Sequence, residues 1–70
     1  MIQAEGADQV RLALAQLPYE QREVVVMHFK GGLTFREIAE WQEVSINTVQ
    51  GRYRYGLDKL RQLLGERSTT

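Results

Sequence analysis

The chain contains no cysteine, one proline and a single histidine among its 70 residues. The absence of cysteine excludes disulfide bonds, cysteine-ligated zinc and thiol catalysis, and the lone His28 cannot form a histidine metal cluster. Long apolar runs are also absent, since a run such as residues 24–27 is far shorter than the roughly 20 residues of a membrane-spanning helix. We therefore predict a protein without a bound metal, a cofactor or a membrane segment.

The first residues lack the basic and apolar pattern of a secretory signal, so we expect a reducing, cytoplasmic setting. A chain of this length forms at most one domain and buries only about 60% of the surface that its unfolded state exposes. Such a domain has little room for a deep catalytic cleft. Glu20 and Glu23 are a candidate acid–base pair, but no nucleophile or metal set accompanies them, and a solvated helix face is the simpler interpretation. We therefore do not expect an enzyme.

The nine basic and nine acidic side chains give a net charge of zero, but they are unevenly distributed. Residues 1–43 hold seven acidic and four basic residues, a net charge of −3. Residues 44–70 hold two acidic and five basic residues, a net charge of +3. This asymmetry suits contact between the last third of the chain and a polyanion. The alternative is a terminal helix with a solvated basic face.

The spacing of apolar residues is helical throughout the chain. It predicts an all-α, compact four-helix domain over residues 8–64, between flexible segments at 1–7 and 65–70. The expected helices cover residues 8–16, 18–29, 34–42 and 45–64. Asp8 is expected to cap the first helix, and Pro18 to stand in the first turn of the second.

The third and fourth expected helices form a helix-turn-helix. Thr34 and Glu37 have the spacing of a capping box, and Ser45 provides a second cap about three residues after the third helix ends. Ile38, Ala39 and Trp41 are expected to face inward. Because helices this short are unstable alone in water, both must pack on the first two.

The fourth helix is expected to have one apolar and one polar side. The apolar stripe contains Ile46, Val49, Tyr53, Leu57, Leu60 and Leu64. The opposite, exposed stripe contains Asn47, Gln50, Arg54, Asp58 and Arg61. Amides such as those of Asn47 and Gln50 can bind adenine in a major groove, and Arg54 can reach a guanine or a phosphate. These side chains are alternatively ordinary solvated residues.

Three further basic side chains suit backbone phosphates, which position a protein on DNA without specifying sequence. Arg36 is expected on the exposed side of the third helix, and Arg52 and Lys59 on the flank of the fourth. The alternative for Arg36 is a simple ion pair with Glu40, four residues later in the helix. His28 is interpreted as a boundary residue of its helix, and Tyr55 as a residue outside the apolar stripe.

Four blocks of sequence carry a resemblance to a known family: residues 14–24 (LAQLPYEQREV), 32–39 (GLTFREIA), 44–49 (VSINTV) and 59–61 (KLR). In this order and spacing they resemble the fourth conserved region of bacterial sigma factors, of the extracytoplasmic-function type. The resemblance covers about residues 12–64. It implies a helix-turn-helix domain of the winged-helix-like superfamily, without a wing, that binds the minus-35 promoter element and the flap-tip helix of the polymerase β subunit. Anti-sigma proteins are a further implied class of partner, and the domain is expected to be monomeric.

The resemblance also implies roles for individual residues. Contacts to base edges are expected from Asn47, Gln50, Gly51 and Arg54. Contacts to phosphates are expected from Arg36, Ser45, Thr48 and Arg52, with Lys59 on the same flank. The polymerase or anti-sigma contact is expected from the apolar residues Val24, Val25, Val26 and Met27.

The sequence departs from the family pattern at three positions. The family usually has a basic residue in place of Gln50 and a serine in place of Gly51. Gln50 removes a charge from the reading surface, and a glycine within a helix costs about 1 kcal/mol relative to alanine. The turn glycine of the family is replaced by Glu43, which carries a steric cost if a positive φ is needed there.

Two alternatives remain open. The DNA-binding domain of response-regulator activators shares the blocks Ile38-Ala39 and Thr48-Val49, although Leu17-Pro18, and Arg52 followed by residues 59–61, favour the sigma family. A sigma-like module that binds polymerase or an anti-sigma partner without reading DNA is favoured by Gln50, Gly51 and the zero net charge.

Overall fold

A computed structural model describes residues 2–65 of the chain and the side chains of residues 8–65. Within this range it contains four α-helices and no strand: α1 (Ile2–Ala15), α2 (Tyr19–Phe29), α3 (Phe35–Gln42) and α4 (Ile46–Leu63). The all-α, four-helix class predicted from the sequence is confirmed. No helix among these residues combines the length and the apolarity needed to cross a membrane.

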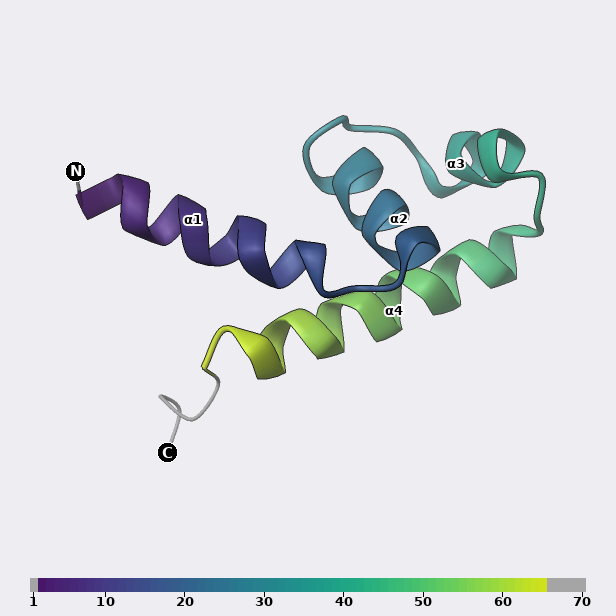
Figure 1. Cartoon of the computed structure of the whole chain (residues 1–70). Coiled ribbons are helices and arrows are strands. Elements are labelled where there is room, and N and C mark those ends of the chain that lie inside the picture. Colours follow the sequence, from purple (N-terminus) through teal and green to yellow (C-terminus); the bar gives the residue numbers. More distant parts are fainter. Residues whose placement is uncertain (1, 66–70) are drawn as a thin grey trace.

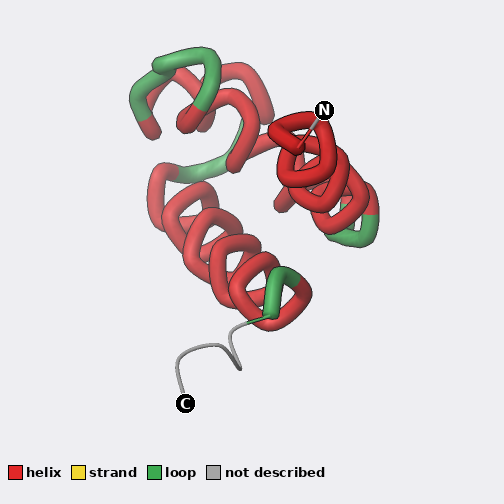
Figure 2. Tube along the Cα trace, turned by 90° about the vertical axis from the view of Figure 1, so that its left-hand side faces the viewer, coloured by secondary structure: helices red, strands yellow, loops and turns green. Residues whose placement is uncertain are grey.

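The long helix α4 contacts each of the other three helices. Figure 1 shows it running beneath α1 and α2, with α3 close to its N-terminal end. Figure 2, turned by 90°, shows that short loops join the helices. The helix-turn-helix made of α3 and α4 therefore rests on α2, and α1 packs on the C-terminal half of α4.

Two helix boundaries differ from the predicted ones. The first helix begins at Ile2 rather than near Asp8; residues 2–7 contain no proline, and their alanines and glutamate favour helix although Gly6 does not. Asp8 is therefore not a cap; its carboxylate lies 3.6 Å from the Arg11 guanidinium within the helix. Pro18 occupies the N-cap position of α2, with extended φ and ψ of −54° and 148°, instead of the first turn. Of the predicted C-terminal tail at residues 65–70, only Gly65 is described, and residues 66–70 lie outside the described residues.

The core consists of two clusters that share helix α2. Val24 and Val25 are neighbours in the sequence, but they point to different clusters because successive helical residues are 100° apart. One cluster joins α2, α3 and α4 and contains Val24, Ile38, Ala39 and Val49. The other joins α1, α2 and α4 and contains Ala13, Leu17, Val25 and Leu60. Both clusters include residues of α4, so contacts along most of its length set the orientation of this helix.

Both helices of the helix-turn-helix begin with the caps predicted from the sequence. The Glu37 N–H donates to Thr34 Oγ1 (3.1 Å), and the Thr34 N–H donates to Glu37 Oε1 (2.8 Å), which completes the capping box. The Thr48 N–H donates to Ser45 Oγ (3.1 Å) and caps α4. Between the caps, Glu43 is left-handed, with φ 59° and ψ 47°. Glu43 thus has a positive φ, at the turn position where the family pattern has a glycine.

Replacing Glu43 with glycine is expected to raise the free energy of unfolding by about 0.5–1 kcal/mol. A non-glycine residue in the left-handed region costs roughly 1–2 kcal/mol, and the greater unfolded-state entropy of glycine offsets part of this gain. Urea denaturation of Glu43→Gly and Glu43→Ala separates backbone strain from charge. Alanine retains the strain, so an equal gain in both variants will show that the charge of Glu43, rather than its φ, is the cause.

Candidate nucleic-acid interface

The outer face of α4 carries the polar stripe predicted from the sequence. Asn47, Gln50 and Arg54 are all exposed. They lie three and four residues apart, so they share one side of the helix. The opposite side is held by the core, with Val49 completely buried. The structure therefore presents two amides and one guanidinium together on the exposed face of α4.

The N-terminal end of α4 has free hydrogen-bonding capacity. The Ser45 and Thr48 hydroxyls lie 3.0 Å apart, and only one of them can donate to the other. The remaining hydroxyl hydrogen is available to an external acceptor, as are N–H groups of the first helical turn. The first turn of α4 contains no acidic residue. Because the N-terminal end of a helix is electropositive, this end of α4 suits an anion such as a phosphate.

Basic side chains flank the exposed stripe. Arg36 on α3 is exposed and lies with Ser45 in a shallow hollow between α3 and α4. Arg36 forms no ion pair with Glu40, the alternative that the sequence left open. Arg52 and Lys59 are separated by two helical turns and so lie on one flank of α4, with Lys59 exposed and Arg52 half-buried. The flank therefore offers two cations in line beside the polar stripe.

Arg52 is anchored by a residue that the sequence analysis did not single out. Its Nη1 donates to Gln42 Oε1 (2.9 Å), and Gln42 Nε2 donates to Glu23 Oε1 (3.1 Å). The other oxygen of Glu23 accepts from the Tyr19 hydroxyl (2.8 Å), and this carboxylate raises the pKa of Tyr19. The position of Gln42 in the sequence could have indicated this role. Gln42 lies four residues after the buried Ile38, on the inward side of α3, where a polar side chain needs a hydrogen-bonding partner.

Two residues assigned to the interior are exposed. Trp41 is 68% exposed because it lies about 60° from Ile38 and about 160° from Ala39 around α3, at the edge of the buried side. Leu64 is 42% exposed because α4 ends at Leu63 and Leu64 is its C-cap. Both positions fit a helical period in the sequence, but Trp41 lies at the edge of the buried side of α3, and α4 ends before Leu64.

His28 is a boundary residue, as predicted. Its ring stacks on Phe35 with centroids 4.4 Å apart, and meets the edge of Tyr53 at 5.0 Å. Its Nδ1 lies 2.8 Å from the Leu33 carbonyl oxygen, within hydrogen-bonding distance. The histidine thus joins the end of α2 to α3 and α4, and its hydrogen bond and ring contacts are structural.

The apolar surface differs from the predicted one. Val24 is completely buried and Val25 is 5% exposed, because both belong to the core clusters described above. Val24 is therefore unavailable for contact, whereas Val25 borders the apolar groove described next, and Val26 and Met27 are half-buried. This corrects the expectation that residues 24–27 together form one contact surface, because Val25 and Val26 line that groove while Val24 and Met27 do not.

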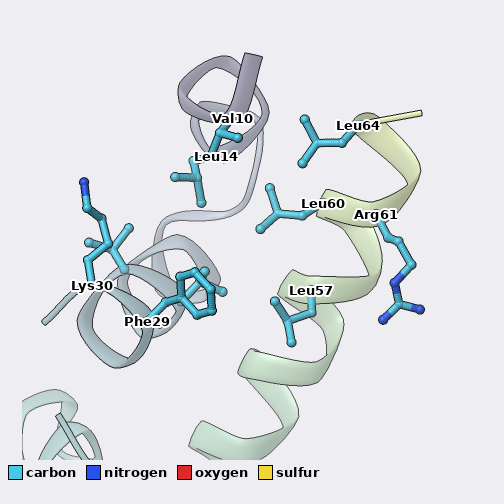
Figure 3. A pocket seen from close by; sticks show the side chains of 10 residues that line it. Val10, Leu14, Phe29, Lys30, Leu57, Leu60, Arg61 and Leu64 are labelled. Carbon is cyan, nitrogen blue, oxygen red and sulfur yellow. The ribbon is translucent and has the colours of Figure 1, made fainter. Parts of the chain in front are cut away.

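An apolar groove of about 380 Å³ instead lies between α1, the end of α2 and the C-terminal half of α4. Phe29, 77% exposed, stands at its edge. Figure 3 shows the apolar side chains directed into the groove, with the charged ends of Lys30 and Arg61 pointing outward at its rim. The apolar lining residues are Val10, Leu14, Val25, Val26, Phe29, Leu57, Leu60 and Leu64. The molecule therefore has an apolar groove that is separate from Asn47, Gln50 and Arg54, although Arg61 of the polar stripe stands at its rim.

Gly51→Ala is expected to raise the free energy of unfolding by about 0.5–1 kcal/mol, since alanine is the better helix former. A Cβ at residue 51 meets no atom within 4 Å, so the gain is not offset. The matched control is Gly56→Ala, whose Cβ lies 2.9 Å from Val25 Cγ2 where α4 approaches α2, and there overpacking cancels the gain. Thermal denaturation of both variants checks this; equal gains would contradict it.

Comparison with known proteins supports the sequence resemblance. The model of the family described as Sigma-70, region 4 matches residues 13–62. Over 50 residues the chain is 42% identical to the protein named ECF RNA polymerase sigma factor RpoE of Cereibacter sphaeroides, a match that covers 71% of this chain and 28% of that protein. The chain thus spans less than a third of the length of this relative. No solved structure matches the chain. Residues 13–62 include α2, α3 and nearly all of α4, and with them the whole polar stripe.

Proposed function

Because the chain belongs to the sigma-70 region 4 family, we propose that it binds the minus-35 promoter element as part of a sigma factor that directs transcription initiation by RNA polymerase. The observation that carries the proposal is the polar stripe of Asn47, Gln50 and Arg54, exposed on a capped helix whose other side is buried. A major groove is wide enough to admit one helix. Family membership also disfavours the response-regulator alternative.

In this proposal the stripe enters the major groove with the N-terminal half of α4 leading. Asn47 and Gln50 read adenines through their amides, and Arg54 reads a guanine. Gly51 lets the bases approach the backbone, since the space beside its Cα is open. Phosphates are bound by Arg36, Ser45 and Thr48 near the N-terminal end of α4 and by Arg52 and Lys59 farther along the same flank, since Thr48 and Arg52 are one helical turn apart.

The zero net charge is compatible with this function if a second contact tethers the domain. We propose that the apolar groove provides this contact by binding the flap-tip helix of the polymerase β subunit. An amphipathic helix placed in an apolar groove is a common mode of recognition. Binding at both sites raises the effective concentration of the domain at the promoter, so that weak DNA contacts suffice. An anti-sigma protein that occupies the groove competes with polymerase.

Phe29→Ser is expected to weaken binding to a flap-tip peptide by about 1.5–3 kcal/mol, the value of burying one large apolar side chain. Phe29 is already exposed in the free domain, so its loss leaves the fold intact. Tyr55→Ser is the matched control, because Tyr55 is 63% exposed but lies on α4 outside the groove. Isothermal titration of the three proteins measures the effect, and equal affinities would exclude Phe29 from the contact.

A salt titration tests the DNA-binding proposal. When a protein neutralises DNA phosphates, the logarithm of its binding constant falls linearly with the logarithm of the salt concentration. The slope is about −0.9 for each phosphate neutralised. Three of the five candidate phosphate ligands are cationic, and only cations neutralise phosphates. We therefore expect a slope of about −3 for a 20-base-pair duplex. The competing interpretation is a module that binds polymerase or an anti-sigma protein without reading DNA. It predicts weak DNA binding at every salt concentration.

A further inference from the structure

The hydrogen bonds that hold Arg52 run through three helices. Tyr19 and Glu23 are on α2, Gln42 is the last residue of α3, and Arg52 is on α4. We propose that Gln42 is a positioning residue for Arg52: it holds the guanidinium on the flank of α4 while it keeps that cation from pairing with Glu23. The inference rests on the proposed function, in which Arg52 binds a DNA phosphate.

The group between a carboxylate and a guanidinium must both donate and accept hydrogen bonds, which an amide does. An ionised carboxylate only accepts hydrogen bonds and a guanidinium only donates them. Gln42 offers both kinds of atom, and its Nε2 faces Glu23 while its Oε1 faces Arg52. Leucine at this position can bond neither neighbour. Glutamate can accept from Arg52 but repels Glu23.

The amide also preserves the charge of Arg52. Among the described residues the ion pairs are Arg11–Asp8 and Arg61–Asp58, so Arg52 takes part in none. A direct pair with Glu23 would neutralise the cation before it met a phosphate. Gln42 uses one of the five N–H donors of the guanidinium and leaves the others available to a phosphate. The side chain is thus ordered in advance without being neutralised.

The far end of this chain of hydrogen bonds is itself held in place. Glu23 accepts from both Gln42 and Tyr19, so each of its oxygens has a partner. Gln42 Nε2 also lies 3.4 Å from the Glu20 carbonyl oxygen, in a second, longer hydrogen bond to α2. Gln42 is half-buried, which limits its alternative rotamers. Fixing Arg52 before binding lowers the entropy lost when a phosphate is bound.

A double-mutant cycle tests the inference with the 70-residue chain and a 20-base-pair duplex. Arg52→Ala is expected to weaken binding by about 5- to 10-fold and to reduce the magnitude of the salt slope by about one. Gln42→Leu is expected to weaken binding by about 3-fold in the wild-type background but by less than about 1.5-fold when Arg52 is already alanine. Gln9→Leu, the same change at an exposed position of α1, is the control and is expected to leave binding unchanged.

The outcomes are distinguishable. Equal losses for Gln42→Leu with and without Arg52 would show that Gln42 acts only on the fold, which overturns the inference; the thermal midpoint of each variant checks the fold directly. An unchanged affinity for Arg52→Ala removes the phosphate contact and the inference with it. If the wild-type chain itself shows no salt-dependent binding, the proposed function fails first.

Discussion

Ile38→Ala is expected to lower the free energy of unfolding by about 2–5 kcal/mol. Ile38 is completely buried at the point where α2, α3 and α4 meet, so the truncation leaves a cavity that the surrounding helices cannot readily fill. A domain of this size has a total stability of about 4–10 kcal/mol. The variant therefore loses a large part of its stability and unfolds near physiological temperature.

Circular dichroism during urea denaturation measures the loss. Ile38→Val removes one methylene and is expected to cost only about 0.5–1.5 kcal/mol. Leu12→Ala is the exposed control, because Leu12 is 66% exposed on α1, and it is expected to change stability by less than about 0.5 kcal/mol. A similar loss for Leu12→Ala and Ile38→Ala would contradict the core described above.

Arg54→Ala is expected to weaken binding to the preferred duplex by about 1–3 kcal/mol and to relax the preference at one base pair. Arg54 is exposed on the polar stripe and forms no ion pair within the described residues, so its guanidinium is available for two hydrogen bonds to a guanine. The fold is expected to be unaffected, since the side chain does not belong to either core cluster.

The measurement is selection from a duplex pool with randomised central bases, followed by sequencing of the bound fraction. Arg11→Ala removes the same charge from α1, far from the stripe in sequence, and controls for the general effect of charge. It is expected to preserve the selected sequence. Identical selected sequences for the wild type and Arg54→Ala would remove Arg54 from the base-reading set.

Much of the fold was predictable because its signals are local. The Thr34–Glu37 capping box and the Ser45 cap depend on residues three positions apart, and both form as expected. The exposure of Asn47, Gln50 and Arg54 was predictable because one helical period describes the whole of α4. The positive φ of Glu43 was anticipated as a cost through the glycine that the family has at this turn.

The residues whose burial or contacts were predicted wrongly, or not at all, are those whose surroundings are set by neighbouring helices, and helical periodicity does not specify these neighbours. Val24 and Val25 formed an apparent surplus of apolar residues, but α2 has a core cluster on each of two sides and buries both. Trp41 remained outside because it lies at the edge of the buried side of α3. Gln42 was overlooked because its partners, Glu23 and Arg52, are 19 and 10 residues away in the sequence. Long-range contacts of this kind decide which apolar residues form a groove and which cation is held in place.

The most direct measurement is a chemical-shift titration of the ¹⁵N-labelled chain with the duplex recovered from the selection. We expect the amide signals of residues 45–54 to shift first and most, while those around the apolar groove, such as Leu14 and Phe29, stay in place until a flap-tip peptide is added. Shifts confined to the groove, with residues 45–54 unchanged at saturating duplex, would contradict DNA binding by the exposed face of α4.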